Sequence, residues 1–342
     1  MAIVTDRQKV LDLYKQAEAK KWVLPCFCTE NLTTTEAILA AAKEYGDKIN
    51  IKDIPVIIAI TNQYDHRTQS VYYTHTRRWD IGLKLFLADL KVLTEKGSPY
   101  ENLKVMVHLD HAQFDDDKEL LSWDMGQFSS IMFDASKVDF EENIRLTSQF
   151  AREFGHQIVV EGACDEIADA TGTEKNELTT AEKAERYYTE TGVDLIVANL
   201  GTEHRAGAKD LKYYGDYARK IKQKIGTKIV LHGASSVSNE QIKDLIDDGI
   251  CKVNIWTALE RDSSPVLLES MVANASKVAS GKIAAQLKEK GLLGIKSVTD
   301  GSASIDYFTT AYRQNIVFNE MKKMIRQYFA LWYRDKDGIN CL

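Results

Sequence analysis

The sequence predicts an α/β fold, a (β/α)8 TIM barrel with a C-terminal helical extension, and three observations lead to it. Eight apolar runs of strand length recur along the 342 residues, and a segment with helical spacing separates each run from the next. Polar residues follow the ends of several runs rather than one alone. Eight alternating units are the number that closes such a barrel. The alternative is a doubly wound open sheet, which would gather its ligands at a single switch point.

The expected strands share a composition rich in apolar and β-branched residues, which is typical of parallel strands buried on both faces. They occupy residues 22–28, 55–61, 104–110, 129–134, 157–162, 194–200, 228–234 and 251–257. The first contains Cys26 and Cys28, whose spacing would allow metal binding, although two reduced thiols in a buried strand are the favoured interpretation. Five cysteines in a chain without a secretion signal do not indicate structural disulfides.

Helices are expected where apolar residues recur at helical spacing between capping residues. A first helix spans 5–20, with Thr5 or Asp6 as its cap; the others are expected at 33–46, 79–97, 115–126, 141–155, 179–192, 211–226 and 239–249. The chain is mostly helical after Glu260. We expect one domain over residues 1–342, in which residues from about 265 to 342 form the last barrel helix and the extension. Such added helices often pack against another subunit, so a homodimer or a higher homo-oligomer is expected.

Composition excludes several classes of protein. Apolar content of 44% and charged content of 27% are those of an ordinary globular chain. A formal net charge of −6 argues against a nucleic-acid binder, which depends on a basic surface. No apolar run approaches the roughly 20 residues of a membrane helix, and the first residues are polar rather than a signal peptide. A cytoplasmic protein without a membrane partner is expected.

Three histidines lie at or just after the ends of expected strands. His111 follows Asp110 at the end of the third strand, and His204 and His232 follow the sixth and seventh. In a barrel these ends converge on one face, where three neutral imidazoles with an open fourth position are a catalytic zinc arrangement. Each histidine taken alone is more commonly a hydrogen-bonded polar residue, but their joint placement favours a metal site. His108 is expected to face away from the metal.

The loops after the seventh and eighth strands are suited to an anion. They read His232-Gly233-Ala234-Ser235-Ser236 and Asn254-Ile255-Trp256-Thr257, and their small and hydroxyl-bearing residues can donate to phosphate oxygens. Many barrels bind phosphate at this position. The remaining histidines, His66, His75 and His156, are expected on the surface.

At these residues the chain resembles the class II, zinc-dependent ketose-bisphosphate aldolases, the family of fructose-bisphosphate and tagatose-bisphosphate aldolases. The resemblance covers roughly residues 5 to 290. LDHA is similar to the family's LDHG, GTEH to its GTxH, LHGASS to its LHGGSG and KVNIWT to its KxNxxT. IMFDAS, VVEGA and PVIIAIT also fall in the family's order. One tetrapeptide would be weak evidence, but the ordered set is specific.

The resemblance implies a role for each matching residue. His111, His204 and His232 would hold Zn²⁺, with another divalent metal as the alternative, and Asp110 would move the proton of the substrate's C4 hydroxyl. Asp134 and Glu161 would support the ligands or hold an alternate metal position. A phosphorylated sugar is the implied substrate, with a monovalent cation near its phosphate. The substrate contacts would be Thr61, Gly201, Arg205, Gly233, Ser235, Asn254 and Thr257, with Asn254 also close to the enediolate.

Several positions depart from the family pattern. Ala163 replaces the second glutamate of the fifth-strand motif, Trp256 replaces a common aspartate, and Cys28 replaces a common asparagine. Arg205 replaces a glycine after His204 and would either bind an anionic group or point away. A second proton-transfer carboxylate is expected in the loop after the fifth strand; the candidates are Asp165, Glu166, Asp169 and Glu174, with Glu166 or Asp169 favoured.

The sequence therefore predicts a zinc aldolase that cleaves a phosphorylated ketose into dihydroxyacetone phosphate and an aldehyde through an enediolate. A sugar-phosphate-binding relative without turnover is one alternative, motivated by Ala163. A class II aldolase for a different ketose phosphate is another. A metal-dependent hydrolase ranks last, because such barrels usually carry an H-x-H pair on the first strand and this chain has none.

Overall fold

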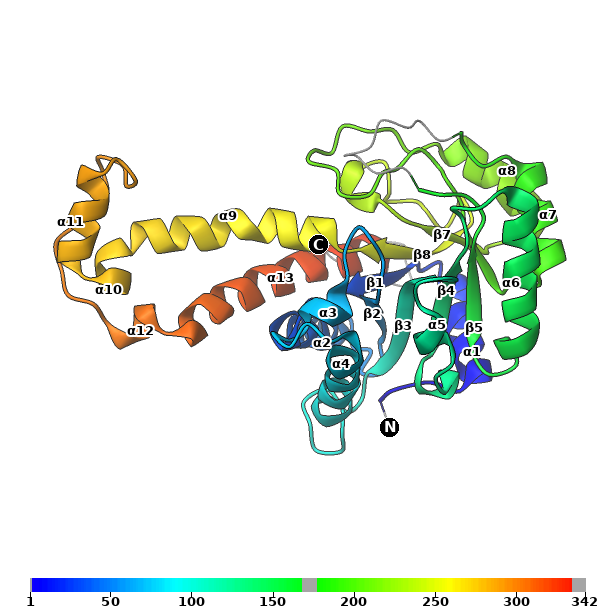
Figure 1. The fold of residues 1–342 in the computed structure, drawn as a ribbon, viewed down its shortest axis with the longest axis horizontal. Helices are drawn as coiled ribbons and strands as arrows, with labels where there is room; N and C mark the ends of the chain where they lie inside the picture. Colours follow the sequence, from blue (N-terminus) through cyan, green and yellow to red (C-terminus); the bar gives the residue numbers. More distant parts are fainter. Residues whose placement is uncertain (1, 168–176, 334–342) are drawn as a thin grey trace.

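The computed structural model describes residues 2–167 and 177–333, and its centre is a closed barrel of eight parallel strands in sequence order (Figure 1). The strands are β1 (Leu24–Cys28), β2 (Pro55–Thr61), β3 (Lys104–Gln113), β4 (Ser130–Asp134), β5 (Val159–Ala163), β6 (Leu195–Val197), β7 (Ile229–Leu231) and β8 (Ile250–Ile255). Because β1 pairs with both β2 and β8, the sheet has no open edge. The predicted barrel is confirmed, and the doubly wound sheet is wrong.

Helices cover the outside of the barrel, as Figure 1 shows. They are α1 (Arg7–Ala19), α2 (Leu32–Lys48), α3 (Gln69–Tyr72), α4 (Trp79–Leu93), α5 (Lys118–Leu121), α6 (Phe140–Phe154), α7 (Ala181–Thr191), α8 (Gly215–Ile225) and α9 to α13, described below. Asp6 caps α1 by accepting from the Lys9 backbone N–H, as one reading of the sequence expected. None of the described helices combines the length and apolarity needed to cross a bilayer.

The expected helix at 239–249 is wrong, because this segment forms successive turns. Its backbone N–H groups bond to carbonyls three residues earlier, as Ile242 does to Asn239 and Asp248 does to Leu245. An α-helix would bond to the fourth residue back. The apolar side chains that suggested a helix are nevertheless buried, since Ile242 and Leu245 have no exposed surface. The amphipathic spacing therefore correctly predicted which side chains are buried, but it predicted the wrong backbone conformation.

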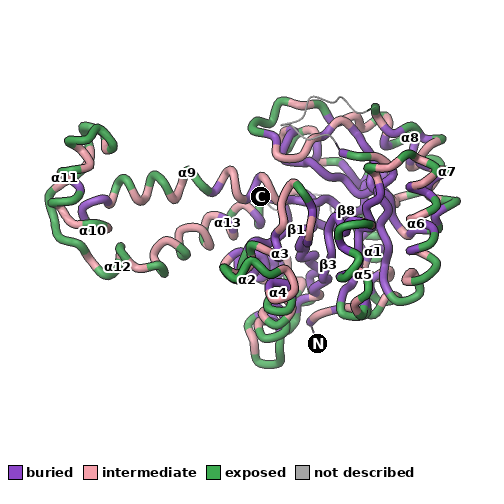
Figure 2. Tube along the Cα trace, viewed as in Figure 1, coloured by how far each residue is buried: buried purple, intermediate pink, exposed green. Residues whose placement is uncertain are grey.

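The strands are almost wholly buried, and the barrel forms the core of the molecule (Figure 2). Helix α1 contacts both β5 and β8, which lie far apart around the ring, so it crosses the N-terminal end of the barrel. The opposite, C-terminal end holds a pocket lined by residues at or after the ends of several strands. Parallel order places the carboxyl ends of all eight strands there.

The chain after β8 forms an arm that projects from the barrel and returns (Figure 1). Helix α9 (Thr257–Ala273) leads out, α10 (Ala275–Ala279), α11 (Gly281–Glu289) and α12 (Ile305–Phe308) form the far end, and α13 (Thr310–Trp332) leads back. The returning end of α13 packs on α2 and β1, where Phe329 lies 5.7 Å from the Tyr45 ring and Tyr333 stacks on Trp22 at 4.4 Å. The end of α13 thus occupies the place of the eighth barrel helix. The expected single domain, with its extension from about 265, stays a prediction.

Candidate active site

An irregularity at the end of β3 brings Asp110 and His111 to the same pocket. Adjacent residues of a regular strand point to opposite faces. Here the register between β3 and β4 shifts between Leu109 and Ala112, and His111 has a φ of 47°, a left-handed conformation that is uncommon for residues other than glycine. Both side chains consequently line the pocket at the C-terminal end of the barrel. Strain of this kind is typical of functional sites.

The three histidines predicted as metal ligands meet in this pocket. One ring nitrogen from each of His111, His204 and His232 lies within 4.8 Å of the others. The Nε2 of His111 is 3.1 Å from the Nδ1 of His232. Two nitrogens bound to one tetrahedral zinc ion at about 2.0–2.1 Å would be separated by roughly 3.3 Å. His111 and His232 are therefore spaced as two ligands of a single ion would be, with a nitrogen of His204 close by.

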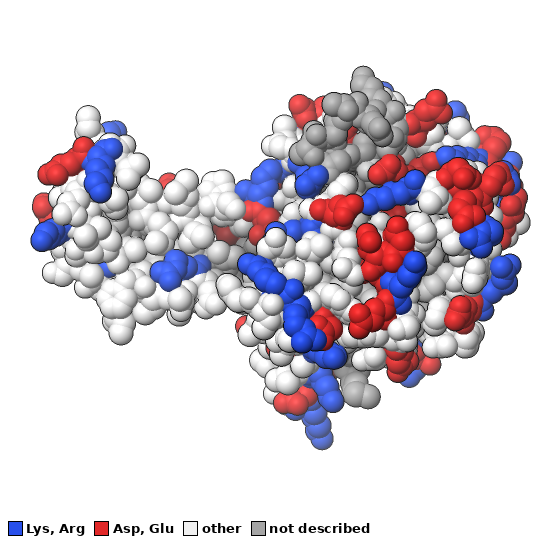
Figure 3. Space-filling view, in the orientation of Figure 1, with Lys and Arg blue, Asp and Glu red and all other residues white. Residues whose placement is uncertain are grey.

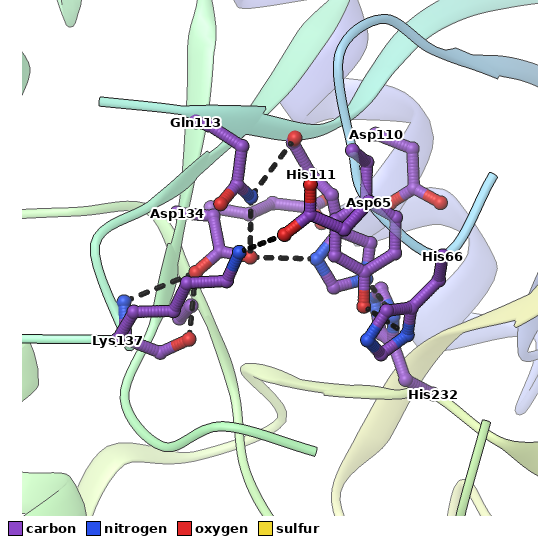
Figure 4. A network of polar contacts seen from close by, with 12 residues as sticks. Asp65, His66, Asp110, His111, Gln113, Asp134, Lys137 and His232 are labelled. Atoms are coloured by element: carbon purple, nitrogen blue, oxygen red, sulfur yellow. Dashed lines mark hydrogen bonds and ion pairs between the residues drawn. The ribbon is translucent and has the colours of Figure 1, made fainter. Parts of the chain in front are cut away.

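Asp134 holds His111 from the side away from His232 (Figure 4). Its Oδ2 is 2.7 Å from the Nδ1 of His111 and 3.0 Å from the amide nitrogen of Gln113, while its Oδ1 accepts from the Ser136 hydroxyl at 2.7 Å. Burial opposes ionisation of Asp134, but the bonds from His111 and Ser136 outweigh it and hold its pKa below the ordinary value. A carboxylate on Nδ1 places the proton there and leaves the Nε2 lone pair for a metal.

The electrostatics of the site also suit a cation. Burial lowers the pKa of His232 well below its ordinary value, so this imidazole stays neutral, the form that binds metals. Burial acts the same way on His111, but the charges of Asp110 and Asp134 outweigh it and raise the pKa. The positive charge of a divalent ion bound by the histidines would balance the negative charges of Asp110 and Asp134. The residues present therefore fit a divalent metal.

Asp110 is fixed at the edge of the histidine group by two contacts. Its Oδ1 accepts from the Nδ2 of Asn254 at 2.8 Å, and its Oδ2 lies 3.4 Å from the Sγ of Cys28. Burial opposes ionisation, yet the neighbouring His111 outweighs it and holds the pKa of Asp110 well below its usual range. Asp110 is thus a carboxylate beside the three histidines, able to accept a proton.

The loops after β7 and β8 complete one wall of the pocket. Gly233 has a φ of 66°, and a Cβ there would lie 2.8 Å from the backbone of Glu203, so this close approach requires glycine. Ser235 and Thr257 line the same pocket, and Thr257 begins helix α9. The amides at a helix N-terminus favour an anion. Arg205 also lines the pocket.

The buried polar atoms of this pocket are incompletely paired. Among the described residues, the Nε2 of His232, the Oδ1 of Asn254 and the Nε1 of Trp256 are buried without a hydrogen-bond partner. Buried polar atoms are normally paired, so several unpaired atoms in one pocket indicate that a ligand belongs there.

The structure does not bring every predicted site residue to this pocket. Thr61 lines it, but its hydroxyl donates to the Arg67 carbonyl. Gly201 and Glu161 are not among the lining residues, and Glu166 lines a different hollow beside Asp165 and Lys183. Asp169 and Glu174 lie outside the described residues. The roles expected for these six residues stay predictions.

The sequence interpretation missed the loop after β2. Tyr64 stacks on the His111 ring at 4.0 Å with an interplanar angle of 2°, and His66 and Arg67 also line the pocket. His66, expected on the surface, is half-buried, whereas His75 and His156 are exposed as expected. The segment Asn62-Gln63-Tyr64-Asp65-His66 follows a strand end directly, as the predicted ligands do, and this position was an available signal.

Comparison with known proteins places the chain in a family. The sequence model of the family described as fructose-bisphosphate aldolase class-II matches residues 8–330. The chain is 29% identical to the fructose-bisphosphate aldolase of Geobacillus stearothermophilus over 255 residues, which cover 72% of this chain and 79% of that protein. It is 32% identical to the uncharacterized protein YdjI of Escherichia coli K12 over 163 residues, 45% of this chain. That match spans 57% of the YdjI protein, less than two thirds of its length.

Two crystal structures share the fold. The fructose-bisphosphate aldolase of Campylobacter jejuni superposes with a TM-score of 0.73 at 18% identity, over 99% of this chain and 96% of that one. The YdjI aldolase of E. coli K12 gives a TM-score of 0.65 at 20% identity, over 95% and 97%. The family match extends over nearly the whole chain, including all eight strands and the three histidines. The chain therefore belongs to the class-II fructose-bisphosphate aldolase family of lyases, and the expectation of an aldolase-family enzyme is confirmed.

Proposed function

We propose that this protein is a zinc-dependent aldolase that reversibly cleaves a phosphorylated ketose into dihydroxyacetone phosphate and an aldehyde. The observation that carries the proposal is the meeting of His111, His204 and His232 within 4.8 Å, beside the carboxylate of Asp110. Imidazole ligands suit zinc. When bound, the metal would act as a Lewis acid on the ketose carbonyl.

The chain's own residues divide the proton transfers between them. Asp110, which Asn254 holds through its Oδ1, takes the proton of the C4 hydroxyl as the C3–C4 bond breaks. The electron pair of that bond passes to the three-carbon fragment as an enediolate. A second carboxylate returns a proton to this fragment, and we assign that step to Glu166 or Asp169 in the loop after β5. In condensation each proton moves in the reverse direction.

The substrate phosphate is assigned to the wall formed by Gly233, Ser235 and Thr257, with Arg205 beside it. The start of α9 and the cation of Arg205 supply positive potential, which would also lessen the need for a monovalent cation. Fructose 1,6-bisphosphate is the first substrate to test. Cys28 and Trp256 line the pocket as departures from the family, so a different ketose phosphate is the second candidate.

The direct test is solvent deuterium exchange into dihydroxyacetone phosphate, followed by NMR, with and without a chelator. We expect zinc-loaded protein to exchange one C3 proton and chelated protein to exchange none, because enediolate formation needs the metal but no aldehyde. Exchange that survives complete metal removal would contradict a metal-dependent aldolase. Zinc-loaded protein that binds the compound without exchange would favour the binding relative without turnover.

We further propose that the arm, residues 257–332, binds a second copy of the chain. Eight of the twelve most exposed large apolar side chains among the described residues lie on it: Leu268, Val272, Ile283, Leu292, Ile295, Val298, Ile305 and Phe308. Much of the arm surface in Figure 3 is also uncharged. Exposed apolar surface of this extent indicates an interaction site.

The four described cysteines are unpaired and buried, which supports a cytoplasmic location.

Sedimentation velocity tests the arm. We expect a species of at least twice the 38.6 kDa chain mass, and dissociation when Leu292 and Ile295 are both changed to Asp, since buried charge at an interface is strongly unfavourable. The exposed Val92, changed to Asp on α4, is the matched control and should leave the assembly intact. A wild-type monomer at micromolar concentration would contradict the proposal.

A further inference from the structure

A second layer of charged residues lies inside the barrel, one layer deeper than the site. Lys252, Glu161 and His108 have no exposed surface at all. The Nζ of Lys252 lies 2.8 Å from both carboxylate oxygens of Glu161 and 2.9 Å from the Nε2 of His108. The Nδ1 of His108 is 2.8 Å from the Ser130 hydroxyl. This buried layer joins β8, β5, β3 and β4.

The layer lies directly beneath Asp110 and Asn254. Lys252 precedes Asn254 by two residues on β8, and His108 precedes Asp110 by two residues on β3. Side chains two apart on a strand share a face, so Lys252 and His108 each lie beneath a site residue of their own strand. The Nε2 of His108 is 3.7 Å from the Oδ1 of Asp110, which is contact without a hydrogen bond.

The arrangement of donors fixes the proton on His108. Burial opposes the charge of Lys252, but Glu161 outweighs it and raises the pKa, so Lys252 stays an ammonium with three N–H donors. Two go to Glu161 and the third goes to the Nε2 of His108. His108 therefore carries its proton on Nδ1 and donates it to Ser130. With its Nε2 lone pair occupied, His108 has no hydrogen to give to Asp110.

Stability alone does not account for this layer. A fully buried ion pair is commonly no more stabilising than an apolar pair of similar volume. Meanwhile the β3 to β4 ladder is interrupted between Leu109 and Ala112, so pairing on that side does not fix the orientation of Asp110. We propose that Lys252 is a positioning residue. Together with Glu161 and His108 it forms a rigid layer of side chains beneath Asp110. This layer keeps the Asp110 carboxylate in its bond to Asn254 and oriented toward the substrate.

This inference rests on the proposed function, and its test compares two half-reactions. The double variant Lys252→Met/Glu161→Leu removes both charges together and so avoids leaving one buried charge unpaired. We expect wild-type metal content, wild-type deuterium exchange into dihydroxyacetone phosphate and a KM within about threefold of wild type, because none of these needs the C4 proton transfer. The kcat for ketose cleavage should fall roughly 10- to 100-fold, the loss expected when a catalytic group is misplaced by about 1 Å.

A second variant keeps the proposal testable if the double variant does not fold. His108→Leu leaves the ion pair between Lys252 and Glu161 intact but removes the imidazole beneath Asp110, so it should show the same selective loss of kcat. His108→Gln retains an oxygen that can accept from Lys252 and should recover most of the kcat. The matched control is Arg7→Met, which removes an ion pair with Asp194 away from the site and should leave kcat unchanged.

A wild-type kcat in folded, metal-loaded His108→Leu or in the double variant would overturn the proposal. So would a parallel loss of exchange and cleavage, which a general loosening of the barrel produces. The 15N NMR signals of histidine-labelled wild-type protein show which ring nitrogen of His108 carries the proton, and this test needs no substrate. His108 protonated on Nε2 would overturn the proposal even if the protein proved not to be an aldolase, whereas failure of wild-type protein to exchange would count against the proposed function instead.

Discussion

His111→Ala removes the metal and the activity together. His111 contributes the nitrogen that lies 3.1 Å from His232, and its orientation is fixed by Asp134, so alanine leaves two ligands where three are needed. We expect metal content to fall from about one ion per chain to near zero, and exchange and cleavage to fall by at least roughly 10³-fold, since Lewis-acid stabilisation is worth several kcal/mol. Atomic absorption on dialysed protein and the two activity assays measure this.

The control for that experiment is another histidine-to-alanine change. His156 is exposed and lies before β5, away from the pocket, so His156→Ala should keep both metal and turnover. A His111→Ala protein with full metal occupancy and normal turnover would refute the ligand assignment. Equal losses in both variants would point to the handling of the protein rather than to the site.

Asp110→Ala separates proton transfer from metal binding. Asp110 touches Asn254 and Cys28 but is not one of the three grouped imidazoles, so its loss should leave the metal bound. Cleavage should fall by roughly 10² to 10⁴-fold, the contribution usual for a positioned acid or base. Exchange into dihydroxyacetone phosphate should be affected much less, because that fragment has no C4 hydroxyl. Steady-state cleavage and metal content measure the two effects.

Asp115→Ala is the matched control, since Asp115 is an exposed aspartate on the loop after β3. It should retain the cleavage rate of the wild type. If Asp110→Ala cleaved nearly as fast as the wild type, the acid and base role would have to move to another group, and Glu166 would be the first to test. If it lost its metal as well, Asp110 would instead be required for the binding site itself.

Much of the fold followed from local patterns. Eight apolar runs produced eight strands, with starts and ends within a few residues of those expected, because a strand buried on both faces has to be apolar throughout. The same order of elements implied that His111, His204 and His232 would converge, since parallel strands present their carboxyl ends together. The sequence alone was therefore enough for the barrel and for the candidate ligands.

Contacts between distant segments decided the rest. The turn that carries Asp110 and His111 to one pocket depends on a register shift between β3 and β4, which no local pattern in β3 specifies. The stacking of Tyr64 on His111 and the placement of His66 depend on how the loop after β2 folds over the barrel mouth. At 239–249 the burial pattern was read correctly, yet packing selected turns over a helix.

Lys252 illustrates the difference between what local sequence predicts and what contacts between distant segments decide. A lysine inside the apolar run Cys251-Lys252-Val253 was visible in the sequence, and a buried lysine needs a partner. Which partner it has could not be read there, because Glu161 and His108 lie 91 and 144 residues away along the chain. Local sequence determined which residues turn inward, through periodicity and burial. Only the closed barrel determined which of them meet, because closure fixes the neighbours of each inward side chain on strands far apart in the sequence.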